Sequence, residues 1–337
     1  MPSSDEEYLR QLYHVARMHY LDKRTKTQIA NELRVSNTQV ARLLREAERR
    51  QIVQIHVSVP PLEGLQNRLR ERFSCLKEAI VLATGPDYMY QLATMGRAAA
   101  DHFESILQDR PNLKVGLSGG NTLYEVVEAF TDRDRNIEIY PTALVARGPY
   151  LPDHMDQMLV ISRMWQKCGR KPDTAHYATV PPFERAKTPD GIQKDNLLLL
   201  KRSKVREVWN GMHDVDVILA GVGAIDVPEE YGRVRGRTIL RPLSEIGITD
   251  KWLQRESIVG DISYSLFDKD GNQRPDHNFF LTVGVNHLKH MAADYPQKRV
   301  VLIAGKFKEA ALKAALRGRL CNALITTDST AEMLLSE

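Results

Sequence analysis

The sequence has few cysteines and no long apolar run. Its three cysteines, Cys75, Cys168 and Cys321, are far apart and form no CxxC pair. This argues against a disulfide framework or a cysteine-based metal site and is typical of buried thiols in a reducing compartment. No stretch of about 18 apolar residues occurs, so no membrane span is predicted. The start, MPSSDEEYLR, is acidic and polar, and we expect a cytoplasmic protein without a signal peptide.

The sequence also lacks a cluster of catalytic side chains, and its net charge is small. The ten histidines are scattered, there is no HExxH motif, and no Ser-His-Asp arrangement is legible. We therefore expect no catalytic residues, no metal and no cofactor. The formal net charge is only +4, from 47 basic and 43 acidic residues. A length of 337 residues suggests two or three domains.

Residues 25–50, TKTQIANELRVSNTQVARLLREAERR, carry the clearest pattern. Apolar residues share one face in each half, which predicts two short helices joined by a tight turn at Arg34. An earlier helix is predicted over 9–20 from the same spacing. Three apolar stripes that converge form a small core, which is typical of a helix-turn-helix. An ordinary solvated helical hairpin is the alternative.

The polar face of the second helix has the residue types that read DNA. Asn and Gln pair with adenine, Arg with guanine, and Thr or Arg with phosphate. Eight basic and three acidic residues lie between Lys23 and Arg50, a local charge of +5 that exceeds the charge of the whole chain. Ser36 is in addition a good helix N-cap. The predicted DNA-binding residues are Lys26, Thr27, Ser36, Asn37, Thr38, Gln39, Arg42 and Arg45.

The next residues suggest a boundary. Residues 51–59, QIVQIHVSV, alternate and predict a strand or wing, and Pro60 and Pro61 end it. An amphipathic stretch over 62–73 predicts a linker helix with a possible dimer contact. We expect a DNA-binding domain over 1–59, a linker over 60–77 and an effector domain over 78–337.

From Glu78 onward, apolar runs of strand length alternate with helical segments. This pattern predicts an α/β fold, doubly wound, with a parallel sheet and helices on both faces. Such sheets bind ligands at the carboxyl ends of their strands. The strands are predicted at 78–83, 113–118, 137–146, 215–223, 299–305 and 322–327, and the helices at 88–107, 121–130, 153–168, 196–211 and 306–317.

One strand end has the features of a phosphate loop. Gly119 and Gly120 make a tight turn, and Asn121 and Thr122 open a helix. Glycines allow close backbone approach, and the free N–H groups of a helix N-terminus attract an anion. A tight turn without a ligand explains the same residues.

Other strand ends supply polar groups. Arg147 can bind phosphate in a bidentate manner or form a surface salt bridge, and Gln157 can reach the same cleft. Asp261 can accept hydrogen bonds from sugar hydroxyls or cap a turn. Lys306 and Lys308 open a helix against its dipole, which a bound anion would explain. Together these groups suit a phosphorylated polyol.

The chain resembles the SorC family of bacterial sugar-binding transcriptional regulators over nearly its full length. The resemblance rests on motifs in the family's order: IANELRVSNTQVARLLREA (29–47), GLSGGNTL (116–123), VARG (145–148), GVGAID (221–226), VGDISYSLFDKDG (259–271), AGKFKEAALKAALRG (304–318) and LITTDSTAEMLL (324–335). Two positions depart from the pattern. Asn121 stands where Ser or Thr is common, and AGK replaces a double glycine, so Lys306 and Lys308 compete for one role.

The resemblance implies an effector domain with the fold of sugar-phosphate isomerases and CoA-transferases, used for sensing. It implies a phosphorylated sugar as effector, a homodimer or homotetramer, and a palindromic duplex operator. The effector-binding residues that it implies are Gly119, Gly120, Asn121, Thr122, Arg147, Gln157, Asp261 and Lys308.

Two rival hypotheses remain. The first is a sugar-phosphate isomerase or lactonase on the same scaffold, with Asp226 or Asp261 as general base. The second keeps the regulator and makes the effector a non-phosphorylated polyol.

Overall fold

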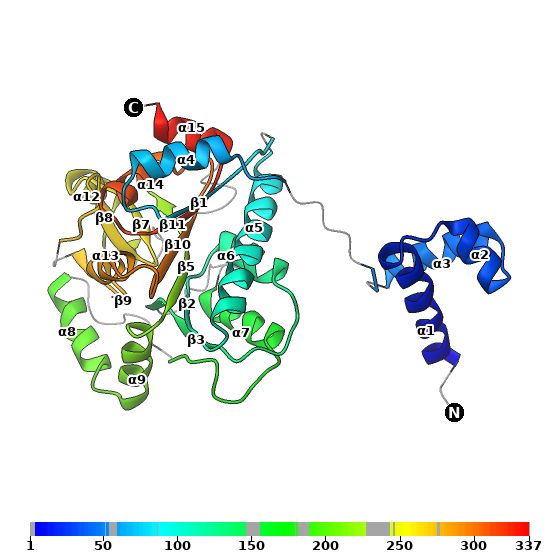
Figure 1. The fold of residues 1–337 in the computed structure, drawn as a ribbon. Coiled ribbons are helices and arrows are strands. Elements are labelled where there is room, and N and C mark those ends of the chain that lie inside the picture. Colours follow the sequence, from blue (N-terminus) through cyan, green and yellow to red (C-terminus); the bar gives the residue numbers. More distant parts are fainter. Residues whose placement is uncertain are drawn as a thin grey trace. The chain divides into compact units, whose positions relative to one another are not determined.

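The protein, described by a computed structural model, divides into two compact units, Met1–Val57 and Ser58–Glu337 (Figure 1). Within the part of the chain that the structure describes, no helix has the length and apolar character needed to cross a membrane. The described residues are 4–50, 52–53, 59–85, 87–145, 156–178, 180, 189–226, 243–244, 247–274 and 277–336.

The first unit is built from helices around a small core. Its elements are α1 (Ser4–Ala16), a short π-helix η1 (Arg17–Leu21), α2 (Lys26–Leu33) and α3 (Asn37–Arg49). The apolar positions predicted from the spacing in α2 and α3 are buried, apart from the partly buried Leu33. The residues that are completely buried here are Leu12, Val15, Ile29, Val40 and Ala47.

Local sequence signals set the helix boundaries in this unit. Thr25 and Gln28 form a capping box at the start of α2, and the Ser36 hydroxyl accepts the Gln39 N–H at 3.1 Å at the start of α3. Arg34 ends α2 with a left-handed backbone, φ 54° and ψ 43°, as the turn requires. The predicted strand 51–59 lies mostly outside the described residues; Ile52 and Val53 form a bend.

The second unit contains a six-stranded parallel sheet in the order β1-β11-β10-β5-β2-β3. Each strand falls within a predicted apolar run, which confirms an α/β fold with a parallel sheet. The strands are β1 (Glu78–Leu82), β2 (Lys114–Leu117), β3 (Glu138–Pro141), β5 (Val217–Gly221), β10 (Arg299–Ile303) and β11 (Ala323–Thr327).

Helices cover both faces of this sheet (Figure 1). Alternate residues of β5 show the two layers: Val217 and Leu219 lie in one core, and Ile218 and Ala220 lie in the other. The first core packs against α5 (Tyr88–Asp109), α6 (Asn121–Ala129) and α7 (Gln157–Lys167). The second packs against α4 (Glu63–Arg72), α9 (Ser203–Met212), α13 (Val285–Ala293), α14 (Glu309–Arg317) and α15 (Asp328–Leu335).

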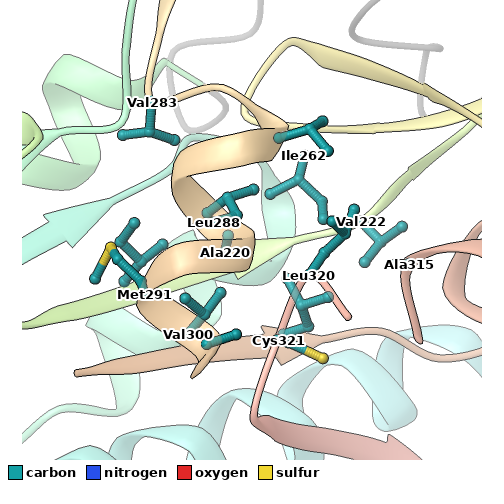
Figure 2. Packing of buried hydrophobic residues seen from close by; sticks show 14 of the residues in the cluster. Ala220, Val222, Ile262, Val283, Leu288, Met291, Val300, Ala315, Leu320 and Cys321 are labelled. Carbon is teal, nitrogen blue, oxygen red and sulfur yellow. The ribbon is translucent and has the colours of Figure 1, made fainter. Parts of the chain in front are cut away.

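The core of the second face joins segments that are far apart in sequence. Figure 2 shows Leu288 and Met291 of α13 close to Ala220 of β5 and Val300 of β10. Leu320 and Cys321, just before β11, belong to the same cluster and are completely buried. This layer anchors α13 and α14 beneath the strands whose carboxyl ends carry the candidate site.

One helix prediction was wrong in extent. Residues 196–211 form the end of α8 (Pro189–Leu199) and most of α9, not a single helix. In one straight helix, Leu199 and Val205 would point in directions about 120° apart, because successive residues turn by about 100°. A break at residues 200–202 lets both side chains be buried.

Short antiparallel strands extend the carboxyl edge of the sheet. β6 (Gly223–Ala224), β7 (Ile258–Ile262) and β8 (Ser265–Asp268) form one sheet, and β4 (Ala143–Leu144) pairs with β9 (Leu281–Thr282). The turn between β7 and β8 has two left-handed residues, Ser263 and Tyr264, with φ 51° and 63°. The short α12 (Asp250–Arg255) packs beside β7, with Leu253 and Ile258 in one small core.

The predicted linker segment is part of the second unit. Leu69 of α4 is completely buried there, and the Leu62 N–H donates to the Val81 carbonyl at 2.8 Å. The Val81 N–H in turn donates to the Gln66 side chain at 3.1 Å. Residues 60–77 are therefore fixed to the sheet edge at β1, and a linker role remains a prediction.

A half-buried histidine pair leads to a prediction on acid stability. The rings of His213 and His287 lie 4.9 Å apart, and burial, then the charge of His213, lowers the pKa of His287 to about 4. The unfolded chain takes up this proton near pH 6.5, so stability from neutral His287 is lost as pH falls from 6.5 through 4. Between pH 7 and pH 5, we expect the free energy of unfolding of the wild type to fall by about 1–2 kcal/mol more than that of His287→Gln.

Urea unfolding followed by tryptophan fluorescence tests this. All three tryptophans, at 165, 209 and 252, lie in the second unit, so the signal follows that unit alone. Asn286→Gln, an exposed change on the same helix at a residue that does not titrate, is the control. Equal pH dependence of wild type and His287→Gln would contradict the prediction.

Candidate functional sites

The predicted DNA-reading face is accessible in the first unit. Arg42 and Arg45 point to solvent on α3, while Val40, Leu43 and Leu44 on the opposite side are buried. Gln39 is half-buried. The other predicted residues are all exposed: Lys26, Thr27, Ser36, Asn37 and Thr38.

Some of these residues also organise the turn. The Ser36 hydroxyl oxygen caps α3, and the Asn37 amide donates to the Thr27 hydroxyl at 3.3 Å. The second contact holds the starts of α2 and α3 side by side. The Arg45 guanidinium donates to the Ala41 carbonyl at 3.4 Å, one turn back. Ser36 thus has a structural role whether or not it contacts a ligand.

Ion pairs refine the charge count of this region. Arg49 and Arg50 bind the Glu46 carboxylate at 2.6 and 2.8 Å, and these contacts lower the pKa of Glu46 to about 2. Arg24 pairs with Glu32. The positive field of the exposed face therefore comes mainly from other cations, namely Lys23, Lys26, Arg34, Arg42 and Arg45.

In the second unit, the winding of the chain places a topological switch point between β2 and β5, and the space outside the carboxyl ends of these two strands is called the crevice below. These strands are neighbours, but β2 leads into α6 on one face and β5 leads toward α13 and α14 on the other. Doubly wound sheets bind ligands outside the carboxyl ends of strands at such a point. Across it, the Ser118 hydroxyl accepts the Gly221 N–H at 3.3 Å.

The predicted phosphate loop lies at this crevice. Gly120 has φ 101° and ψ 166°, and among the described residues, its chain neighbours apart, no atom lies within 4 Å of where a Cβ would stand. It precedes α6, whose first N–H groups have no acceptor inside the helix. Thr122 is buried, and Gly221 lies against it, with an added Cβ at 3.7 Å from the Thr122 side chain. An anion has both space and donors here.

Asp261 of β7 is buried beside Gly223 of β6, the short strand that follows β5. Its carboxylate accepts the Tyr264 N–H at 2.9 Å, and an added Cβ on Gly223 would stand 1.9 Å from its Oδ1. Burial raises the pKa of Asp261 to about 6, although the Tyr264 hydrogen bond and the positive charge of Lys308 oppose this. Thr122 and Asp261 therefore flank one segment, Gly221–Gly223, from its two ends.

The two candidate lysines have different surroundings. Lys308 precedes α14, and burial lowers its pKa while the Asp261 charge raises it. The Lys306 ammonium lies 4.8 Å from the centre of the Phe307 ring. Phe307 takes a left-handed backbone, φ 70°, so α14 begins at Glu309, later than predicted. The geometry favours Lys308 as the cation that belongs to the crevice.

Gln157 lies near the crevice, but its side-chain amide already donates hydrogen bonds to other residues of the protein. The side-chain nitrogen donates to the Leu117 carbonyl and, at 3.1 Å, to the Thr142 hydroxyl. Thr142 in turn donates to the Ser263 hydroxyl at 2.8 Å. Gln157 thus joins the end of β2 to the β7–β8 turn, and it positions the crevice. Sequence reasoning assigned no site role to Ser118, Thr142 or Ser263, which directly follow the observed strands β2, β3 and β7.

Arg147 lies outside the described residues, so its predicted role stays a prediction. Asp226, the alternative general base, is exposed just beyond β6, whereas Asp261 is buried. Among the described residues, no three His, Cys, Asp or Glu side chains form a group that could hold a metal ion.

Comparison with known proteins identifies the family. Residues 62–336 match the family model for a sugar-binding domain (Sugar-bind). The chain is 25% identical over 328 residues to the deoxyribonucleoside regulator of Bacillus subtilis, covering 96% of each chain. It is 24% identical over 346 residues to the sorbitol operon regulator of Klebsiella pneumoniae, covering 99% of this chain and 100% of the relative.

Solved structures agree on the fold. The crystal structure of full-length SorC from Klebsiella pneumoniae matches with a TM-score of 0.71 at 22% identity, over 99% of this chain and 100% of that one. A probable sor operon regulator from Shigella flexneri matches with a TM-score of 0.64 at 23% identity, over 81% and 98%. The chain therefore belongs to the sugar-binding domain family and is a SorC-family sugar-binding transcriptional regulator.

Proposed function

We propose that this regulator binds operator DNA through α3. When a phosphorylated sugar enters the β2–β5 crevice, the protein releases the DNA or changes its conformation on it. The observation that carries the proposal is the open space at Gly120, in front of the α6 N-terminus and at the switch point of the sheet. The named relatives, which are regulators, support a sensing role over catalysis. The relation to isomerase and CoA-transferase folds stays a prediction.

The crevice offers different chemistry at its two ends. The α6 N-terminus, with Asn121 and Thr122, suits a phosphate, and Arg147 is proposed to complete that end. Asp261 suits sugar hydroxyls, because a carboxylate accepts several hydrogen bonds in a small space. Lys308 provides a cation near Asp261. A phosphorylated polyol would contact both ends at once.

The effector can act only through unequal affinity for two conformations of the protein. We propose a homodimer or homotetramer on a palindromic operator, since paired half-sites match paired recognition helices. Cytoplasmic DNA is the proposed partner.

A selection of random duplexes with the purified full chain, followed by anisotropy titration, tests the proposal. Pentose and hexose monophosphates should change the affinity for the selected duplex, and their unphosphorylated parents should not. A response to the parent sugars alone would favour the polyol alternative. Turnover of the sugar phosphates would favour an isomerase or lactonase.

Arg42→Ala should weaken binding to the selected duplex. If Arg42 reads a base, we expect a loss of about 1–3 kcal/mol and relaxed preference at one position. Arg49→Ala is the matched control, because Arg49 lies on the same helix but is paired with Glu46. Unchanged affinity and preference in Arg42→Ala would remove Arg42 from base reading.

A further inference from the structure

A second polar hollow lies at the opposite edge of the sheet from the effector crevice. It has a volume of about 450 Å³, within the usual range for small-molecule sites. Lys77 precedes β1 and Arg319 precedes β11, so the hollow borders the amino ends of these strands. Its lining residues are Ser74, Cys75, Lys77, Asp270, Asn272, Lys289, Ala292, Ala293, Arg317, Gly318 and Arg319.

The backbone fixes one wall of this hollow. Gly271 and Gly318 pack against each other so closely that a Cβ on Gly271 would stand 2.6 Å from the Gly318 Cα. The Asp268 carboxylate accepts the Asp270 and Asn272 N–H groups, each at 2.9 Å, which shapes the turn. This turn is held on the end of α14, so Asp270 and Asn272 face the cations from a preformed loop.

Four cations line the hollow against one carboxylate. In the part of the chain that the structure describes, Arg317 and Arg319 have no carboxylate partner. The Lys289 ammonium donates to the Asn272 side chain at 3.0 Å, and the Lys77 ammonium donates to the Ser74 carbonyl at 3.1 Å. Both acceptors are neutral. The single carboxylate, Asp270, is bound by Lys269 at 3.1 Å.

Helix ends do not balance this charge. The C-termini of α4, α13 and α14 lie at the hollow, and each contributes about −0.5 elementary charge. With Asp270, they leave roughly one to two positive charges unbalanced. A phosphate monoester carries about −1.5 to −2 at neutral pH and forms bidentate contacts with guanidinium groups.

We propose that this hollow is a second anion site, which binds a small phosphate-bearing metabolite independently of the effector crevice. Arg317 and Arg319 would bind the phosphate, and Lys77 and Lys289 would surround it. Double-stranded DNA would need an extended basic surface, whereas these cations enclose a concave space of limited size.

Cys75 lines the hollow and provides a local readout. It is half-buried, and the other thiols, Cys168 and Cys321, are buried and serve as internal references. The rate of Cys75 alkylation by iodoacetamide, measured by peptide mass spectrometry on the full chain, should fall as inorganic pyrophosphate is added. Sodium chloride at matched ionic strength should not protect it.

Three variants decide the outcome. In Arg317→Gln with Arg319→Gln, the pyrophosphate concentration for half-protection should rise about 100-fold, because two charge-assisted hydrogen bonds are lost. Lys201→Gln, an exposed change elsewhere, and Gly120→Ala, at the crevice, should leave protection unchanged. Equal protection by chloride, protection kept in the double variant, or protection lost in Gly120→Ala would each overturn the proposal.

Discussion

Gly120→Ala is expected to reduce effector affinity by about 100-fold or more while DNA binding persists. A Cβ at this position would project into the open space before α6, and φ 101° is strained for any L side chain. Moving the first N–H groups of α6 would cost two or more charge-assisted hydrogen bonds to a phosphate, each about 1.5–3 kcal/mol. Calorimetric titration with pentose and hexose monophosphates measures the loss.

Gly85→Ala is the matched control for this experiment. Gly85 lies in the loop after β1, at the carboxyl edge of the sheet. A Cβ there also meets no atom within 4 Å among the described residues other than its chain neighbours, and its φ lies outside the left-handed region. Its effector affinity should equal that of the wild type. If Gly120→Ala, with an unchanged melting temperature, bound the sugar phosphates as the wild type does, the phosphate loop would not be the anion site.

Asp261→Asn is expected to stabilise the second unit by about 3 kcal/mol at pH 7. The carboxyl is buried, and its pKa rises from 3.8 to about 6, so ionising it in the folded state is unfavourable. The folded chain holds this proton more tightly, and wild-type stability falls as pH rises from about 4 through 6. The Asn side chain keeps an oxygen that can accept the Tyr264 N–H.

Urea unfolding by tryptophan fluorescence at pH 4 and pH 7 measures this effect. The gain of the variant over the wild type should be small at pH 4 and reach its full size at pH 7. Asp268→Asn is the control, because Asp268 is also at a strand end and accepts backbone N–H groups, but lies at the other end of the hairpin. The variant should also bind the effector less well if Asp261 accepts sugar hydroxyls. A pH-independent gain would exclude a raised pKa as the cause.

The sheet could be predicted from the sequence because parallel strands are buried on both faces. The runs at Val217–Gly221 and Arg299–Ile303 are almost wholly apolar, and such runs alternating with helices leave few other architectures. The order of the strands could not be predicted, since it depends on which face each crossover covers. The switch point between β2 and β5 was therefore unknown, although the glycines on both sides were visible.

Individual residues of the candidate site could be proposed from the sequence, but the contacts between them could not. The turn at Gly119–Gly120 and the acid at Asp261 stand at strand ends, where sequence alone draws attention. The contact between Thr122 and Gly221, and that between Asp261 and Gly223, join segments over 35 residues apart in sequence. The role of Gln157 as a positioning residue also came only from the structure, because its partners Leu117 and Thr142 lie on other segments.

The path of the chain from Gly221 to Gly223 limits how far apart the two proposed ends of the crevice can be. Two residues of extended chain span about 7 Å, and Thr122 and Asp261 lie against the two ends of this stretch. One small metabolite can therefore bridge both ends, because even a three-carbon phosphate is about as long as this span. Selection by carbon number must then come from other residues of the crevice and not from the spacing of this segment.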